Sequence, residues 1–390
     1  FGGLLNYKLD VLGNTSYSRF YIRITLVLLF LLCLIEWKEL VLGLRFLYGL
    51  CLGVLLPCDL GDLFRLSPPK FRKVSGAIIG CSLSLGLTSS MLLTYLESLG
   101  WISWKLIYIY LALIQVMALL INFFIHHIDL SYEYALQLND REKAEKILSQ
   151  YLTPECVKWM IREEEKLLSL SNRPDQIKGS LFIYYREFIM VCIIYAGLSA
   201  SFVSNYIGYM TFFMCRDLQN QAEVSVSGLV MTIACCVELI TKILTILFPC
   251  MIVKRKKTLI CGLLLGAILW AAQSYFYYID NWTAEKIIVV MWMAAIGYFL
   301  SPAIYCTATD FLPSELIGVV MSLCRVYDII MLSIFSFLFP KQLSTTLYWQ
   351  ASLFFMIITI IVIIIIAVYT IESGGLTRSA IHSILTRKNS

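Results

Sequence analysis

Charged residues are scarce in this sequence of 390 residues. Asp, Glu, Lys and Arg make up 15% of it, whereas 59% of the residues are hydrophobic and the mean hydropathy is +0.78. These values lie far outside the range of soluble domains, so we expect an integral membrane protein. The net charge is only +5, and the Lys and Arg residues lie in short loops between apolar segments. This pattern suits contact with lipid headgroups and indicates no nucleic-acid partner.

The residue patterns that carry enzyme chemistry are also missing. The sequence has 3 His, and no Cys/His cluster has the spacing of metal ligands. No GxxxxGK[ST] loop is present to hold a phosphate, and no nucleophile has a recognisable base nearby. The 13 Cys lie mostly inside apolar runs, where cysteine acts as a small hydrophobe, so no disulfide framework is predicted. We therefore expect no enzyme, no metal site, no cofactor and no ATP-driven pump.

Long apolar runs dominate the sequence. A helix that crosses a membrane needs about 20 apolar residues. Ten segments meet this length, with approximate bounds 20–36, 39–60, 75–97, 102–127, 184–214, 225–252, 258–280, 285–309, 315–339 and 346–371. The first residues, FGGLL, resemble the end of a further span, which suggests that an N-terminal part is missing.

The charged loops predict an orientation. The stretches KFRK (70–73), 129–180, KRKK (254–257) and TRKNS (386–390) are rich in charge, and the helix count places them on one side of the membrane. Positively charged loops favour the cytoplasm, so this side is predicted to be cytoplasmic. We expect a multi-pass protein of the plasma membrane.

The segment 129–180 is the only long polar insertion. Its apolar residues recur at helical spacing among many charges, which predicts two or three short amphipathic helices under the membrane. It separates the remainder of an N-terminal transmembrane half (1–128) from a C-terminal six-helix half (181–372), which a cytoplasmic tail follows (373–390). If two missing spans are added, the plan is six spans, a helical linker and six spans. With these two counted, the fifth span is 75–97, the seventh 184–214, the eighth 225–252, the tenth 285–309 and the eleventh 315–339.

Several short motifs follow one another in order. They are LRFLYGLCLG (44–53), FRLSPPKFRKVSG (64–76), VKRKKTLICG (253–262), TDFLPSELIG (309–318) and IESGGL (371–376). With the layout of the spans, they resemble the sugar-porter branch of the major facilitator superfamily over essentially the whole chain. The resemblance implies an all-α fold of two six-helix halves and transport by alternating access. It also implies gating or motif roles for Arg45, Arg72, Asp310 and Glu372.

The sequence departs from the family pattern in several places. Arg65 occupies an acidic position, Ile317 an arginine position, and Gly80 the position of a sugar-binding glutamine in the fifth span. These changes indicate a divergent member.

Polar residues near the middle of the membrane are the candidates for solute contact, because alternating access places the solute between the two halves. The seventh span carries Ser201, Asn205 and Tyr209, of which Asn205 best matches the sugar-contacting run of the family. In the tenth span, SPAIY places Pro302 where the family has a proline, and Tyr305 offers an aromatic ring. The alternative for these residues is structural: helix packing, a tolerated kink and a packed ring.

Two charge pairs lie inside predicted spans. Glu238 and Lys242 are four residues apart in the eighth span, where a single charge costs roughly 2.5–3.5 kcal/mol, so they can neutralise each other on one helix face. Three roles are open for this pair: it binds a polar or charged substrate, its carboxylate takes up a proton, or its two charges neutralise each other for structural reasons. Arg325 and Asp328 in the eleventh span form a similar pair, for which we expect a gating or structural role.

These features predict transmembrane transport of a small polar solute. A sugar such as a hexose is the leading candidate, carried by facilitated diffusion or with proton coupling. Two alternatives stay open: an organic-ion carrier, which the charge pair in the eighth span would suit, and a non-transporting nutrient sensor, which the departures from the motifs would suit. The predicted partners are a small-molecule solute, protons and membrane lipid.

Overall fold

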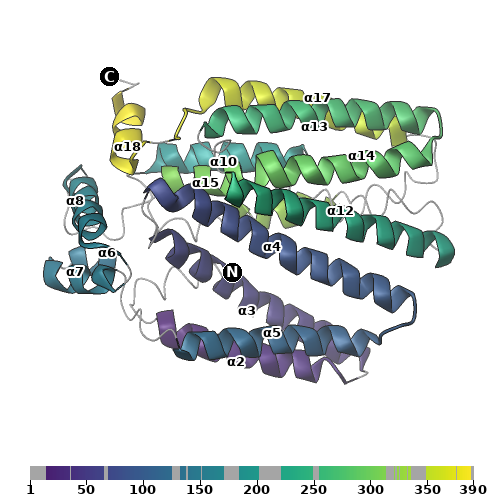
Figure 1. Ribbon diagram of the computed structural model, residues 1–390, viewed down its shortest axis with the longest axis horizontal. Coiled ribbons are helices and arrows are strands. Elements are labelled where there is room, and N and C mark those ends of the chain that lie inside the picture. Colours follow the sequence, from purple (N-terminus) through teal and green to yellow (C-terminus); the bar gives the residue numbers. More distant parts are fainter. Residues whose placement is uncertain are drawn as a thin grey trace.

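The computed structural model describes residues 15–35, 37–65, 69–124, 132–137, 139–150, 152–170, 184–201, 221–248, 254–312, 320, 323–324, 326–331, 333–334, 348–374 and 376–387. Within these ranges every regular element is a helix. Long helices lie side by side along the molecule, and short helices gather at one end (Figure 1). We call the end that holds the short helices the linker end.

Four helices of the described residues precede the predicted linker: α2 (Thr15–Leu32), α3 (Lys38–Arg65), α4 (Pro69–Ser98) and α5 (Trp104–Phe124). Helices α2, α3 and α5 share an apolar core in which Leu26, Phe30, Leu44 and Tyr108 are buried. Between α4 and α5, Gly100 has a φ of +72°, a left-handed conformation that costs glycine little. We call these four helices the first group.

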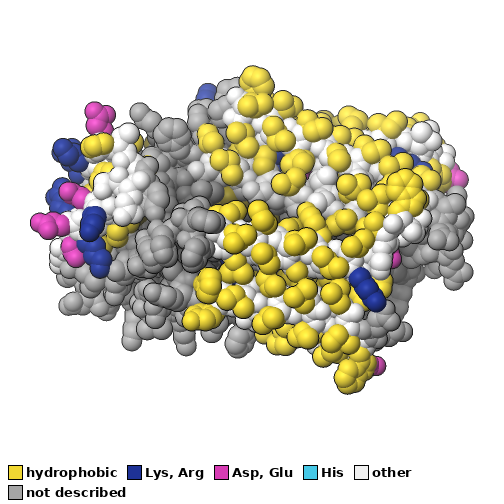
Figure 2. Space-filling view, turned by 60° about the horizontal axis from the view of Figure 1, so that its bottom comes forward, with side chains coloured by type: hydrophobic (Ala, Val, Ile, Leu, Met, Phe, Trp, Pro, Cys, Tyr) yellow, Lys and Arg dark blue, Asp and Glu magenta, His cyan; other side chains and the backbone are white. Residues whose placement is uncertain are grey.

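The predicted linker contains α6 (Tyr132–Gln137), α7 (Arg141–Ser149) and α8 (Pro154–Leu170). Two or three short amphipathic helices were predicted in this segment, and these three helices share a buried cluster that includes Leu148 and Ile161. Charged side chains gather at this end, whereas hydrophobic side chains cover the flank of the long helices (Figure 2). The exposed fractions of Leu42 and Phe46, for example, are 71% and 69%. A surface of this kind suits contact with lipid.

The second group follows the linker. Its described helices are α10 (Tyr185–Ala200), α12 (Gln221–Leu247), α13 (Arg255–Tyr278), α14 (Trp282–Ala295), the π-helix η3 (Ile296–Leu300), α15 (Ser301–Phe311) and α17 (Tyr348–Tyr369). Aromatic rings fill its core: the centroid of the Trp270 ring lies 5.5 Å from that of Trp292 and 5.2 Å from that of Phe355. Gly266 makes room for this packing, since a Cβ there would lie 2.5 Å from the Trp292 ring.

Among the described residues, six helical stretches are long and apolar enough to cross a membrane: Val74–Ser98, Trp104–Ile121, Ser225–Leu247, Arg255–Tyr278, Trp282–Leu300 and Trp349–Tyr369. The prediction of ten complete spans is therefore not confirmed. Residues 202–214 of the predicted seventh span, most of the predicted eleventh span and the FGGLL segment lie outside the described residues. The apolar part of α2, Phe20–Leu32, is a shorter helix.

Helix α4 belongs to the first group in sequence but packs chiefly against α12 and α15 of the second group (Figure 1). Gly228 of α12 lies beside the Tyr95 ring of α4, and an added Cβ there would be 3.4 Å from the ring, an ordinary van der Waals distance. Likewise, Thr88 of α4 donates a hydrogen bond of 3.1 Å to the carbonyl oxygen of Cys235 in α12. We call this contact between the two groups the α4–α12 seam.

A final helix, α18 (Arg378–Arg387), lies at the linker end and contacts both α10 and α8. His382 Nδ1 lies 2.6 Å from Glu187 Oε1 of α10, and the backbone N–H of Ser379 donates to Glu163 Oε1 of α8 over 3.3 Å. The segment that the sequence presents as a tail is therefore docked on the helical body.

Candidate functional site

The charge pair predicted in the eighth span forms in the middle of α12. One helical turn separates Glu238 from Lys242, and the Lys242 ammonium group pairs with Glu238 Oε1. Both residues are 4% exposed. The pair is buried inside the protein and does not face lipid, which is the usual arrangement for charges within a membrane.

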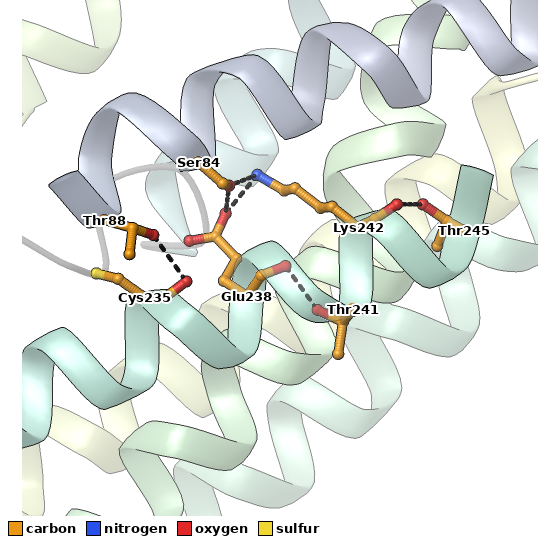
Figure 3. A network of polar contacts seen from close by, with 7 residues as sticks. All are labelled: Ser84, Thr88, Cys235, Glu238, Thr241, Lys242 and Thr245. Atoms are coloured by element: carbon orange, nitrogen blue, oxygen red, sulfur yellow. Dashed lines mark hydrogen bonds and ion pairs between the residues drawn. The ribbon is translucent and has the colours of Figure 1, made fainter. Parts of the chain in front are cut away.

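Ser84 of α4 joins the two charges across the α4–α12 seam (Figure 3). Its hydroxyl donates to Glu238 Oε1 over 2.8 Å and accepts a hydrogen bond of 2.5 Å from Lys242 Nζ. The residue is 1% exposed. We call Ser84, Glu238 and Lys242 the seam triad.

One oxygen atom of the triad has no hydrogen-bond partner in the part of the chain that the structure describes. Glu238 Oε2 is buried and accepts no hydrogen bond from any described residue. A buried carboxylate oxygen without a donor costs roughly 1–3 kcal/mol or more. This oxygen is therefore ready to accept a hydrogen bond from an incoming group.

Small residues surround the triad. A Cβ on Gly80 of α4 would lie 3.3 Å from Ser301 Oγ and 3.6 Å from Lys242 Cδ, so the charge pair, α4 and the start of α15 meet at this point. On the other side, a Cβ on Gly297 of η3 would lie 2.8 Å from the backbone oxygen of Glu238. The π-helical turn of the tenth helix therefore packs directly on the triad, and π-helical turns occur frequently at functional sites.

The triad can bind polar groups without a net charge. Its carboxylate accepts hydrogen bonds, its ammonium group donates them, and its hydroxyl does both. The two formal charges cancel, so a neutral solute would leave the site neutral. Within the described residues no group of His, Cys, Asp and Glu could hold a metal ion.

The other predicted solute-contacting residues are only partly described. Ser201 is buried at the end of α10, and its hydroxyl donates to the carbonyl oxygen of Leu198 over 2.9 Å. Asn205 and Tyr209 lie outside the described residues. Pro302 and Tyr305 lie in α15, directly after the π-helical turn, but their side chains are not described. The contacts of these four side chains with solute stay a prediction.

Among the predicted gating residues, Arg45 and Asp310 each have a clear partner. Arg45 of α3 donates two hydrogen bonds, of 3.1 and 2.9 Å, to the Tyr108 hydroxyl of α5. Asp310, near the end of α15, forms a buried ion pair with Arg255 at the start of α13. This pair ties two helices of the second group together.

Of the remaining four gating candidates, two have described side chains. Glu372 Oε1 accepts hydrogen bonds from the backbone N–H of Lys256, over 3.4 Å, and of Gly374, over 3.2 Å. Asp328 is buried at 2% exposure. The side chains of Arg72 and Arg325 are not described.

Two partners were not anticipated from the sequence. Ser84 is one of several Ser and Thr residues between positions 82 and 90, and nothing in its neighbours distinguishes it. Arg255 lies in the predicted basic KRKK loop, which indicated an interfacial cation and not a buried ion pair.

The long apolar helices are those of an integral multi-pass membrane protein. Residues 10–323 match the family described as the Major Facilitator Superfamily, and the chain belongs to this superfamily. It is therefore a transporter and not an enzyme. A comparison with curated protein sequences finds no match.

Solved transporters share the fold at low sequence identity. The proton:xylose symporter XylE bound to 6-bromo-6-deoxy-D-glucose aligns with a TM-score of 0.79 and 13% identity, over 98% of this chain and 86% of the symporter. XylE from E. coli in an inward open conformation aligns with a TM-score of 0.64 and 13% identity, over 98% of this chain and 87% of that one. The human organic anion transporter MFSD10 aligns with a TM-score of 0.61 and 15% identity, over 94% and 80% of the two chains. The predicted resemblance to sugar porters is confirmed for the fold.

Proposed function

We propose that this transporter carries a small neutral polar solute, a sugar of the hexose class, across the plasma membrane by alternating access. The observation that carries the proposal is the seam triad, which is buried, polar and without net charge between the two helix groups. Sites of this kind suit a solute with several hydroxyl groups, because each hydroxyl both donates and accepts hydrogen bonds.

The charge balance supports a neutral solute. A charged solute would leave one uncompensated charge in the closed site, and a charge at the membrane centre costs roughly 2.5–3.5 kcal/mol. A sugar hydroxyl can donate to the open Glu238 Oε2 and leave the ion pair intact. The similarity to a symporter solved with a bound sugar analogue points in the same direction.

The predicted residues complete the proposed site and gates. In this proposal, Ser201, Asn205 and Tyr209 contact the solute from the seventh span, and Pro302 and Tyr305 contact it from the tenth. We expect Asn205→Ala or Tyr305→Ala to reduce uptake while membrane expression stays normal. Unchanged uptake in both variants would show that the solute binds elsewhere in the protein.

The gating part of the proposal assigns the closing of the linker end, the predicted cytoplasmic side, to charged residues predicted near that end. The residues are Arg72, Asp310, Arg325, Asp328 and Glu372. Arg45 lies toward the opposite end, because it donates to Tyr108 near the start of α5, so its proposed gating role applies to that end. The buried pair between Asp310 and Arg255 supports this assignment, since it fixes the end of α15 to the start of α13.

Uptake by proteoliposomes tests the proposed function. The protein would be reconstituted and incubated with a radiolabelled hexose, with and without an imposed pH gradient, and the double variant Glu238→Gln/Lys242→Met would serve as a site-disabled control. Saturable uptake without a gradient would establish a facilitative sugar carrier. Uptake that needs the gradient would establish proton coupling. Absence of uptake by protein shown to be folded would refute the proposal and favour an organic-ion carrier or a sensor.

An organic-ion carrier is the second candidate, because the triad contains full charges and an organic anion transporter shares the fold. The variant Glu238→Gln separates a sugar carrier from an organic-cation carrier. With this variant, a sugar carrier should still transport a neutral sugar to a measurable extent, whereas an organic-cation carrier should no longer transport its cation. Loss of cation transport with no sugar transport in any variant would replace the sugar proposal.

A further inference from the structure

Ser84 is the only member of the seam triad that comes from the first helix group. Glu238 and Lys242 lie on α12, and their ion pair is internal to that helix. The bonds from Ser84 cross the α4–α12 seam. A movement that separates α4 from α12 therefore leaves the ion pair intact and removes only the hydroxyl group.

The hydrogen bonds of Ser84 are the ones that a solute hydroxyl would form. Its oxygen donates to a carboxylate and accepts from an ammonium group, at 2.8 and 2.5 Å. Each alcohol group of a sugar offers the same donor and acceptor on a single oxygen. A neighbouring hydroxyl of the same sugar could then donate to Glu238 Oε2, which no described residue reaches.

We propose that the Ser84 hydroxyl is an internal substitute for a solute hydroxyl. In the closed seam it satisfies Glu238 Oε1 and Lys242 Nζ. When the seam opens it withdraws with α4, and a hydroxyl of the solute takes over the same two bonds. This inference rests on the proposed function and adds the step by which solute binding compensates for opening the seam.

The surroundings support Ser84 as the group that exchanges. Bonds to charged groups are stronger than bonds between neutral groups, so the two bonds of Ser84 outweigh the neighbouring Thr88 bond to a neutral carbonyl oxygen. One turn away, Gly80 contributes no side chain to the seam. The bonds of Ser84 therefore contribute more to the closure of the seam than the Thr88 bond does.

Because Ser84 and the solute compete for the same two hydrogen bonds, a mutation that removes the Ser84 hydroxyl should strengthen solute binding and not weaken it. Ser84→Ala removes the competitor but keeps Glu238 and Lys242, so the solute should bind more tightly. We expect the Kd for a hexose to fall at least about tenfold, because the variant removes two competing hydrogen bonds to charged groups. Ser84→Cys, whose thiol is a weak donor and acceptor, should give an intermediate Kd.

The matched control is Ser82→Ala. Ser82 lies on the same helix and is exposed, and its hydroxyl donates to the Ile78 carbonyl oxygen within that helix over 3.0 Å. The Kd of this variant should equal that of the wild type. A residue that contacts the solute directly, or that only supports the fold, would give a higher or unchanged Kd when it is replaced.

The experiment measures equilibrium binding of a radiolabelled hexose to the purified full chain, together with hydrogen–deuterium exchange without solute. Tighter binding and faster exchange in α4 and α12 for Ser84→Ala, but not for Ser82→Ala, would support the inference. An unchanged or higher Kd would overturn it. If the wild type binds no hexose, the proposed function is refuted. In that case the exchange data still test Ser84 by themselves: if α4 and α12 of Ser84→Ala exchange at the same rate as in the wild type, the role of Ser84 in closing the seam is refuted as well.

Discussion

Replacement of Lys242 by methionine should destabilise the protein strongly. Methionine has a similar length and suits an apolar interior, so the variant removes the charge and preserves much of the volume. The Glu238 carboxylate would remain 4% exposed, with Ser84 as its one donor among the described residues and with Oε2 still unpartnered. Breaking a buried ion pair in this way costs about 3–5 kcal/mol. Glu238→Gln should cost a similar amount, because it leaves a buried ammonium group without a counterion.

The double variant should recover most of this loss. Glu238→Gln/Lys242→Met contains no buried charge, and uncharged replacements of buried ion pairs are often close to neutral in stability. The two single effects should therefore not add, since residues in direct contact couple energetically. The coupling energy is expected to be several kcal/mol.

Thermal unfolding in detergent provides the assay. A thiol-reactive fluorescent dye reports unfolding, because buried cysteines such as Cys235 become accessible only then. Each single variant should unfold on the order of 5–10 °C below the wild type, and the double variant should unfold near it. Lys143→Met, on the exposed surface of α7, is the control and should change little. Single variants as stable as the wild type, or a double variant less stable than both, would refute this account of the triad.

Three further outcomes are expected. Arg255→Met should lower the unfolding temperature by an amount similar to Lys242→Met, because it leaves a buried aspartate without its ion pair; wild-type unfolding would contradict this. Gly266→Ala should cost about 1–3 kcal/mol by overpacking against an indole ring, whereas Gly43→Ala, with no described atom within 4 Å of the added methyl group, should unfold like the wild type. His382→Ala should speed protease cleavage near the C-terminus, since Glu187 loses its partner at 2.6 Å; an unchanged cleavage rate would show that α18 docks without this contact.

Local patterns allowed much of the helical structure to be predicted. The pairing of Glu238 with Lys242 follows from a spacing of four residues on one helix, so it needs no knowledge of the fold. The linker helices follow from apolar residues at helical spacing among charges. Both predictions depend on contacts within about one helical turn.

Contacts between distant segments could not be predicted in the same way. Ser84 is 154 residues from Glu238 in the sequence, and its environment in α4 differs little from that of its serine neighbours. Arg255 and Asp310 meet only because α13 and the end of α15 are brought together by the packing of the second group. The helical state of Arg378–Arg387 was also missed, since a short charged tail has no strong apolar period of its own. In each case the contact or helix depends on tertiary packing between segments that are distant in the sequence.

The π-helical turn η3 (Ile296–Leu300) changes how the tenth helix relates to its sequence. A π-helical turn holds more residues than an α-helical turn, so the pattern of inward-facing positions shifts across it. Deleting one residue within it would restore a regular α-helix and rotate α15 by about 100° relative to α14, which would turn Ser301 and Asp310 away from their present neighbours. Relatives with an uninterrupted tenth helix should therefore align with this chain only if a one-residue gap is placed in this turn.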